Sequence, residues 1–222
     1  MRSVELYCGG YYHVYNRGVD KRNIFPTKSD YQRFLFTMDI LNDANFQPNN
    51  SLSKLKIEPN VYKQPYVRIM CYCLMPNHHH LELEQLIDNG ISLYMARLSN
   101  SYTKYFNIKY DRKGRLFESS FKAIEITNDD YLLHLTRYIH LNSLDLIEPR
   151  WKTNGISNWK NASRFLESFP WSSYQSYLKL KNDPVIDIGI LKEVIKSPMA
   201  YKKFIQEWTE KSFNKLHPLA ID

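Results

Sequence analysis

The segment from residue 65 to 84 constrains the fold most strongly, because two strand-like runs flank a short turn. Residues 65–74 (PYVRIMCYCL) are dense in strand formers, and residues 78–84 (HHHLELE) alternate in residue type. Between them, residues 75–77 (MPN) favour a turn, because proline cannot continue a central ladder and asparagine tolerates turn geometry. The segment therefore predicts a β-hairpin with three consecutive histidines just beyond its turn.

Alternation assigns the side chains of this hairpin to two faces. In the second run, His78 and His80 share one face and His79 points to the other. Two imidazoles on one face can bind one metal ion and leave coordination positions open, as a catalytic metal requires. The pattern alone leaves open the alternative that they are surface polar residues beside a turn. In the first run, one face is expected to carry Val67, Ile69, Cys71 and Cys73.

The periodicity of the rest of the core predicts the order β-α-β-β-α-β-α. Further strands are expected at residues 11–16 and 121–126, and helices at residues 31–41, 93–108 and 131–142. Ser29 or Asp30 is expected to cap the first helix, and Thr127 or Asn128 the last. This order is that of a ferredoxin-like, split β-α-β fold. We therefore expect an α+β protein with an antiparallel sheet and its helices on one face.

The chain length of 222 residues suits one domain with an appendage. We expect the core domain at residues 1–148, interrupted by a polar insertion loop rich in Asn and Pro at residues 43–64. Residues 149–222 are expected to form a C-terminal extension of helical and irregular structure, with one helix at residues 200–210.

Charge and composition favour a nucleic-acid partner. The formal net charge is +7 and the pI is near 9.1, which favours nucleic acid over an anionic membrane. The three cysteines are too few for a disulfide framework, and the sequence has no zinc-type pair of CxxC motifs. No segment approaches the roughly 18 apolar residues of a membrane span, and the N-terminus lacks the apolar region of a signal peptide. We therefore expect a cytoplasmic protein.

A second candidate feature lies on the last helix of the predicted core. Tyr138 and Asn142 are four residues apart and therefore share one helix face, which His134 joins one turn earlier. A tyrosine in this place can act as a nucleophile, and an amide oxygen can be a hard ligand to an ion held by two imidazoles. On spacing alone, an aromatic core position followed by a C-terminal Asn cap explains the pair better.

Four motifs in order resemble one known family. They are YHVYNRG (residues 12–18), LMPNHHHLELE (residues 74–84), GRLFESSFKAIEI (residues 114–126) and RYIHLNSL (residues 137–144). Together they resemble the HUH-type single-tyrosine transposases, in particular the REP-associated tyrosine transposase branch. The resemblance covers about residues 11–146 with one insertion, and WSSY (residues 171–174) resembles a C-terminal element of that branch.

The resemblance implies a metal-dependent endonuclease and strand transferase that acts on single-stranded DNA beside hairpins. By that resemblance His78 and His80 are the metal-binding pair, Tyr138 is the nucleophile and Asn142 is the third ligand. The implied ion is Mg²⁺ or Mn²⁺, and the implied intermediate is a 5′-phosphotyrosine. Relatives include dimers, so a homodimer stays open. The alternative function is a domesticated or inactive module that binds single-stranded nucleic acid, and a zinc hydrolase is the weaker third.

Basic residues gather in two loops of the predicted core. The charge and the resemblance together favour DNA contacts at these positions, with ordinary solvated charge as the alternative for any single residue. The candidates are Arg17, Lys21 and Arg22 in the first loop, Arg112, Lys113 and Arg115 in the second, and Lys122 in the strand that follows.

Overall fold

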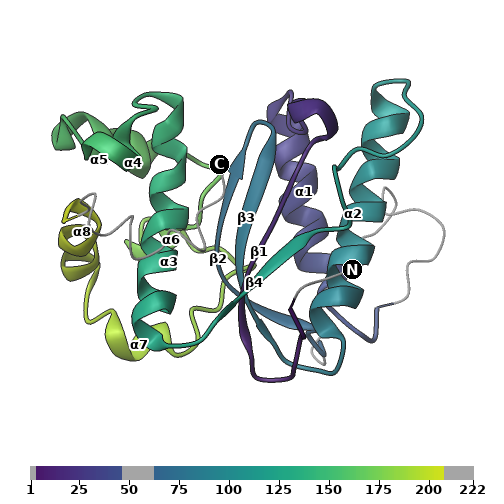
Figure 1. Ribbon diagram of the computed structural model, residues 1–222, viewed down its shortest axis with the longest axis horizontal. Helices are drawn as coiled ribbons and strands as arrows, with labels where there is room; N and C mark the ends of the chain where they lie inside the picture. The colour runs from purple at the N-terminus through teal and green to yellow at the C-terminus, as the bar shows by residue number, and fades with distance from the viewer. Residues whose placement is uncertain (1–3, 47–62, 208–222) are drawn as a thin grey trace.

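The four strands form one antiparallel sheet in the order β2-β3-β1-β4, as the ferredoxin-like prediction requires (Figure 1). The computed structural model describes residues 4–46 and 63–207. Its strands are β1 (Tyr11–Arg17), β2 (Val67–Met75), β3 (His78–Gln85) and β4 (Lys122–Ile126). Helix α1 (Lys28–Leu41) connects β1 to β2, and α2 (Gly90–Lys109) connects β3 to β4. The predicted insertion loop falls largely on residues 47–62, outside the described residues.

The hairpin of β2 and β3 forms as predicted, with Met75 paired to His78 across the turn. The turn is fixed in space because the carbonyl of Pro76 accepts hydrogen bonds from the backbone N–H groups of Ile24 and Phe25, at 2.7 and 3.0 Å. The turn therefore holds the start of β3 beside the chain that leaves β1.

The predicted faces of β2 are wrong beyond Ile69, because a β-bulge between Ile69 and Cys71 shifts the register with β3. Val67 and Ile69 share the core of α1 and α2 with Tyr72, whereas Cys71 and Cys73 belong to the core on the opposite face. An extra residue in one strand reverses the face of every residue after it.

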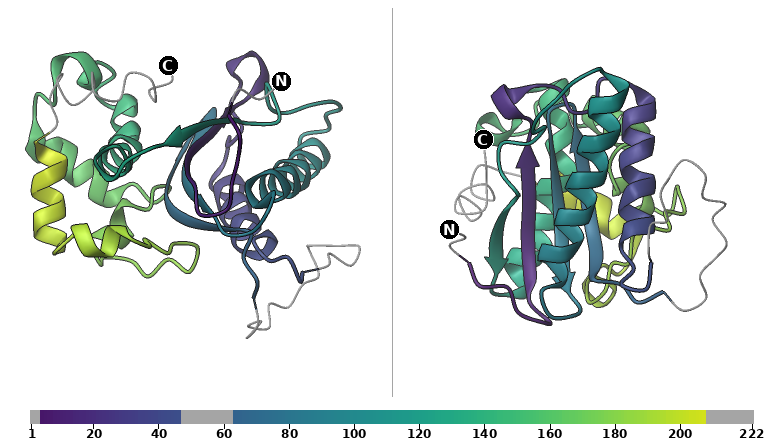
Figure 2. Two further views of the ribbon diagram at one scale, coloured as in Figure 1. Left: turned by 60° about the horizontal axis from the view of Figure 1, so that its bottom comes forward. Right: turned by 90° about the vertical axis from the view of Figure 1, so that its right-hand side faces the viewer.

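The prediction that the helices share one face holds for α1 and α2 only. Helix α3 (Asp129–Leu141) packs on the opposite face of the sheet, as Figures 1 and 2 show. The face that β2 presents there carries Met70, Cys71 and Cys73, all fully buried, and apolar surface of this extent needs a cover. The sheet is therefore a central layer between two helical layers.

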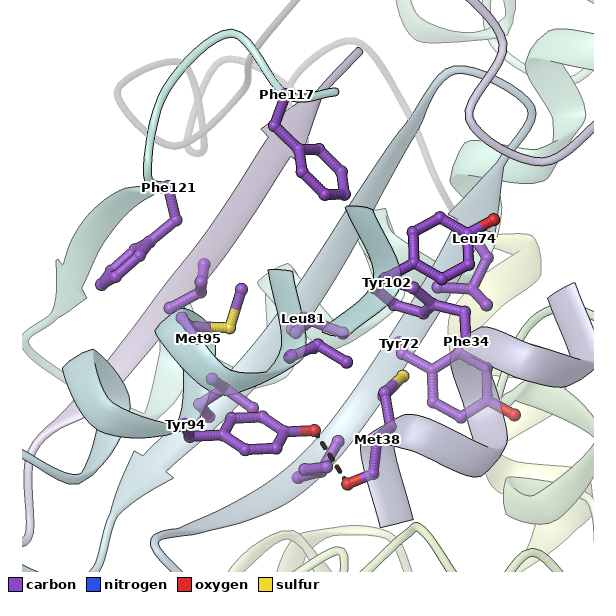
Figure 3. Close-up of a cluster of buried hydrophobic side chains, with 14 of the residues drawn as sticks. Phe34, Met38, Tyr72, Leu74, Leu81, Tyr94, Met95, Tyr102, Phe117 and Phe121 are labelled. Atoms are coloured by element: carbon purple, nitrogen blue, oxygen red, sulfur yellow. Dashed lines mark hydrogen bonds between the residues drawn. The ribbon is translucent and has the colours of Figure 1, made fainter. Parts of the chain in front are cut away.

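Between the sheet and helices α1 and α2 lies a core rich in aromatic side chains (Figure 3). The hydroxyl of Tyr94 donates to the carbonyl of Met38 at 3.1 Å, and that of Tyr102 donates to the carbonyl of Ile24 at 2.5 Å. Buried phenols need such acceptors, because an unpaired hydroxyl in a core costs about 1–3 kcal/mol. These bonds join α2 to α1 and to the loop after β1.

Helix caps differ from the prediction at α1 and agree at α3. Thr27 rather than Ser29 or Asp30 is the N-cap of α1, and Asp30 completes its capping box from inside the helix. Asn128 caps α3, since its side-chain oxygen accepts from the backbone N–H of Tyr131 at 2.9 Å.

The C-terminal segment packs against α3 and along β2. After the 3-10 helix η3 (Asn142–Leu146) come α4 (Trp151–Asn154), α5 (Trp159–Ser168), α6 (Tyr174–Tyr177), α7 (Leu191–Val194) and α8 (Pro198–Gln206). The N–H of Leu74 donates to the carbonyl of Trp171 at 2.9 Å, and Ser172 forms a bridge with Cys73. Helix α8 lies where a helix at 200–210 was expected, although residues after 207 are outside the described part.

Buried His140 joins α3 to this segment. Its Nδ1 lies 2.6 Å from the hydroxyl of Tyr201, and its Nε2 lies 2.8 Å from Oγ of Ser173. Burial lowers the pKa of His140 to about 3, so the ring is neutral at physiological pH.

None of the helices in the described ranges is long and apolar enough to cross a membrane.

Candidate active site

Strand β3 brings the first and third histidines of the run together, as alternation predicts. The ring centroids of His78 and His80 are 4.9 Å apart, with perpendicular ring planes. His80 is buried, with 1% of its surface exposed, and His78 is half-buried. Both side chains lie on the face of the sheet that α3 covers, so they are available to a group between the sheet and α3.

The middle histidine lies on the other face, in the core below α1. The ring of His79 packs 5.2 Å from Phe34 and 5.8 Å from Phe117, measured between ring centroids. Burial lowers the pKa of His79 to about 3, so it is neutral at physiological pH. Neither ring nitrogen has a hydrogen-bond partner among the described residues. His79 is therefore no ligand of a site on the α3 face.

Helix α3 places Tyr138 opposite the histidines within one chain. The ring centroid of Tyr138 lies 5.9 Å from that of His80, and the two ring planes meet at 85°. The residue is fully buried, and α4 covers it: Trp151 lies 6.2 Å away between centroids, and Nζ of Lys152 lies 5.6 Å from the phenol ring. The candidate nucleophile and the candidate ligands are thus neighbours, and α4 separates the tyrosine from solvent.

Asn142 follows Tyr138 by one helical turn and is also fully buried. Neither its amide oxygen nor its amide nitrogen has a hydrogen-bond partner in the described part of the chain, and the same holds for Nε2 of His80. A buried polar group left unpaired costs about 1–3 kcal/mol, so these atoms need an explanation. An ion that accepts a lone pair from the amide oxygen and from Nε2 of His80 would explain those two atoms, whereas the amide nitrogen can only donate a hydrogen bond.

The candidate metal ligands belong to two chemical types, imidazole and amide. Among the described residues, no group of three or more His, Cys, Asp or Glu side chains could hold a metal ion. The third ligand that the family resemblance implies, the amide of Asn142, is of another type, and its oxygen is buried without a hydrogen-bond partner among the described residues. The set contains no thiolate, unlike most structural zinc sites. Its amide oxygen is a ligand type that suits Mg²⁺ and Mn²⁺, and its imidazoles are common ligands of transition-metal ions.

His13 on β1 belongs to this site, although sequence reasoning assigned it no role. Its Nε2 lies 2.9 Å from Nδ1 of His80, and the two rings are stacked with centroids 5.1 Å apart. The signal available in the sequence was alternation in β1, which places His13 and Tyr15 on one face. The register that makes Tyr15 the cross-strand partner of His80 comes from the structure.

Glu82 continues the face of His78 and His80 but carries no charge at neutral pH. Burial raises the pKa of Glu82 to about 8. Oε2 of its carboxyl group accepts hydrogen bonds from Sγ of Cys71 at 3.0 Å and from Oγ1 of Thr136 at 2.8 Å. Glu82 therefore joins β3 to β2 and to α3 rather than adding negative charge beside the histidines.

A pocket of about 90 Å³ opens next to the histidines. It is lined by Tyr15, Asn16, Arg17, Asn77, His78, His79, His80, Glu118 and Lys122. Two predicted DNA contacts, Arg17 and Lys122, therefore lie at the histidine pair. Lys122 is exposed, whereas Arg17 pairs with Glu118 at 3.0 Å. Tyr138 does not line this pocket.

The two basic loops converge beside the β2–β3 turn, as loops at strand ends are expected to do. The N–H of Val19 donates to the carbonyl of Leu116 at 2.9 Å, and the side chain of Asn77 donates to the carbonyl of Lys21 at 3.3 Å. Burial and then the nearby charge of Arg22 lower the pKa of Arg112. Lys21, Lys113 and Arg115 are exposed. The structure thus gathers the predicted basic residues around one end of the sheet.

This arrangement agrees with the family resemblance of the sequence. A ferredoxin-like antiparallel sheet that presents two histidines of one strand to a tyrosine on a facing helix is what the sequence resemblance to single-tyrosine transposases leads us to expect. The sequence profile of the family described as "Transposase IS200 like" matches residues 45–142. This range contains β3, Tyr138 and Asn142, and the match confirms the resemblance to that family.

Among solved structures, the chain is similar to a REP-associated tyrosine transposase bound to a REP hairpin. The two share 13% sequence identity with a TM-score of 0.49, over 86% of this chain and 96% of that chain. No curated protein matches the sequence.

Proposed function

We propose that the protein is a metal-dependent endonuclease and strand transferase for single-stranded DNA, with Tyr138 as its nucleophile. The observation that carries the proposal is the approach of Tyr138 to His80, at 5.9 Å between ring centroids within one chain. The transposase family match spans both residues. The catalytic unit is then the domain at residues 1–148, with residues 149–222 as its extension.

His78, His80 and Asn142 would hold the ion, which we propose to be Mg²⁺ or Mn²⁺. The unpaired, buried Nε2 of His80 and the unpaired amide of Asn142 support this assignment. A bound divalent ion supplies positive charge that polarises the scissile phosphate and stabilises the charge on its oxygens.

Tyr138 would carry the covalent step. Its phenol oxygen bonds to phosphorus, the bond from phosphorus to the 3′-oxygen breaks, the phenol loses its proton and the 3′-oxygen gains one. The 5′-phosphotyrosyl link conserves the energy of the phosphodiester, so reversal onto another 3′-hydroxyl joins strands without a nucleotide cofactor. A free phenol has a pKa near 10 and is a poor nucleophile at neutral pH, so its environment must favour the reacting form.

The substrate that we propose is single-stranded DNA with a hairpin near the cut site. The two basic loops and Lys122 would contact phosphates, and the ring of Tyr15 beside Lys122, 5.8 Å from its Nζ, would stack on a base. Because Tyr138 is buried under α4, cleavage requires α4 to move away from the tyrosine ring. The approach of Tyr138 to His80 within one chain supports an active site formed in cis, and a homodimer would then not be needed to complete it. We place the reaction in the cytoplasm.

The test is covalent capture of DNA by Tyr138→Phe and wild-type protein. Single strands with a hairpin and randomised flanks, labelled at the 3′ end, would be incubated in Mn²⁺ and resolved on a denaturing gel, because the 5′-phosphotyrosyl link retains the 3′-side fragment. Wild type and Tyr131→Phe, a control on the same helix, should form the labelled adduct, and Tyr138→Phe should form none. An adduct with Tyr138→Phe would show that another residue is the nucleophile.

The complete burial of Tyr138 favours a second candidate, an inactive module that binds structured single strands. In that case wild-type protein and Tyr138→Phe would bind the hairpin DNA equally, and neither would form an adduct in Mn²⁺. The same gel, together with a binding titration, separates the two functions.

A further inference from the structure

In both candidate ligands, the ring nitrogen Nδ1 contacts a neighbouring side chain. Nδ1 of His80 lies 2.9 Å from Nε2 of His13, and both side chains are buried. Nδ1 of His78 lies 2.7 Å from Oδ1 of Asn77. Asn77 is oriented by its own amide nitrogen, which donates to the carbonyl of Lys21. Neither His13 nor Asn77 is among the residues for which the family resemblance implies a role.

The contact with Asn77 determines where His78 carries its proton. An amide oxygen can only accept a hydrogen bond, so Nδ1 of His78 must donate. A neutral imidazole has one N–H group, and Nε2 of His78 then carries a lone pair.

The contact between the two imidazoles admits two arrangements of one hydrogen. If Nε2 of His13 donates, the neutral ring of His80 carries its proton on Nε2, where a buried N–H meets no acceptor among the described residues. If Nδ1 of His80 donates, its Nε2 carries a lone pair instead. Only the second arrangement lets His80 bind a metal ion through the buried nitrogen.

We propose that His13 and Asn77 are the positioning residues of the metal site, which accept hydrogen bonds from Nδ1 of His80 and Nδ1 of His78 so that both rings present Nε2 to the ion. The inference rests on the proposed role of the two histidines as ligands. Acceptors of this kind fix the tautomer and the ring orientation of a ligating histidine, and their removal weakens metal binding by roughly 10–100-fold.

The experiment is a Mn²⁺ titration of the full-length protein without DNA, followed by the electron paramagnetic resonance signal of free Mn²⁺. His13→Phe keeps an aromatic ring on β1 but removes the acceptor, and it should bind Mn²⁺ about 10–100-fold more weakly. His13→Gln restores an acceptor oxygen and should recover most of the affinity. Asn77→Ala should lose Mn²⁺ affinity by a similar factor. Asn77→Asp keeps an acceptor oxygen and should bind Mn²⁺ nearly as tightly as wild type. His79→Leu, which changes the histidine between the two ligands, should bind Mn²⁺ as wild type does.

Equal affinity of His13→Phe and wild type would overturn the role of His13, as would an equal loss in His13→Phe and His13→Gln. Urea unfolding in EDTA shows whether the variants fold. If His13→Phe does not fold, long-range ¹H–¹⁵N spectra of wild-type protein with ¹⁵N-labelled histidine and Mg²⁺ decide the matter. The proposal requires the proton of His80 on Nδ1, and a proton on Nε2 would refute it. Neither measurement uses DNA, so failure of the Tyr138 nucleophile leaves both readouts intact.

Discussion

Replacing His79 by leucine should stabilise the protein and leave the site on the opposite face intact. His79 is fully buried against Phe34 and Phe117, and its two nitrogens have no hydrogen-bond partner within the described residues. Removing unpaired buried polar atoms gains about 1–3 kcal/mol. The weaker ring packing and the change of shape cost about 1 kcal/mol. We therefore expect a net gain of roughly 1 kcal/mol near pH 8.

The gain should increase as the pH falls. The folded pKa of His79 is about 3 because the ring is buried, whereas an unfolded histidine titrates near 6.5. Below pH 6.5 the unfolded chain binds a proton at His79 and the folded protein does not. The free energy of unfolding therefore decreases progressively as the pH falls. Between about pH 8 and pH 5 the loss amounts to about 2 kcal/mol. Leucine cannot titrate, so its advantage over histidine should reach roughly 3 kcal/mol near pH 5.

The assay is urea unfolding of wild type and His79→Leu in EDTA, followed by circular dichroism at both pH values. Other buried histidines, such as His140, titrate equally in both proteins and cancel in the difference. A difference in unfolding free energy that stays constant with pH would refute the argument, because it would mean that His79 is protonated in the fold or is not buried there. Mn²⁺ affinity, measured on the same two proteins without EDTA or urea, should be unchanged.

Two further predictions concern the fold and the DNA contacts. Asp30→Ala should lower the free energy of unfolding in urea by about 3 kcal/mol. Asp30 is fully buried, completes the α1 capping box and pairs with Lys109 at 2.7 Å. A loss below about 1 kcal/mol would mean that the buried pair does not form. The binding of hairpin DNA would be followed by fluorescence anisotropy at several salt concentrations. In the double variant Lys113→Ala, Arg115→Ala, the slope of log binding constant against log salt concentration should be shallower by about 0.7 for each phosphate that is no longer neutralised. Lys203→Ala on α8 should leave this slope unchanged. Equal slopes for the double variant and wild type would remove that loop from the DNA interface.

The sequence predicted the elements of the core well and their arrangement less well. Alternation in β3 assigned His78, His79 and His80 to the correct faces, because the strand is regular throughout. In β2 the same reasoning failed after Ile69, since a bulge adds a residue without a signature in the residue types. The apolar pattern of α3 predicted a buried stripe along the helix. It did not predict the face of the sheet that the helix covers, because helical periodicity is the same on either face.

The residues of the candidate site were likewise predicted from the sequence, but two of its tertiary contacts were not. His78, His80, Tyr138 and Asn142 came from spacing and from the resemblance, both of which are local in sequence. The contact of His13 with His80 depends on the register of β1 against β3, which residue patterns do not specify when both strands alternate. The cover that α4 forms over Tyr138 depends on the path of a C-terminal segment with little periodicity.

Unpaired buried polar atoms lie on both faces of β3, and their surroundings separate two causes. The nitrogens of His79 lie among aromatic side chains, where apolar replacement removes the penalty and sacrifices no hydrogen bond. Nε2 of His80 instead lies on the face that carries His78, Tyr138 and a backing partner on Nδ1. A partner on Nδ1 satisfies that buried nitrogen, and when it accepts a hydrogen bond it leaves the lone pair of the neutral ring on Nε2. The ion that we propose at His80 would remove the penalty there, whereas the penalty at His79 reflects packing alone.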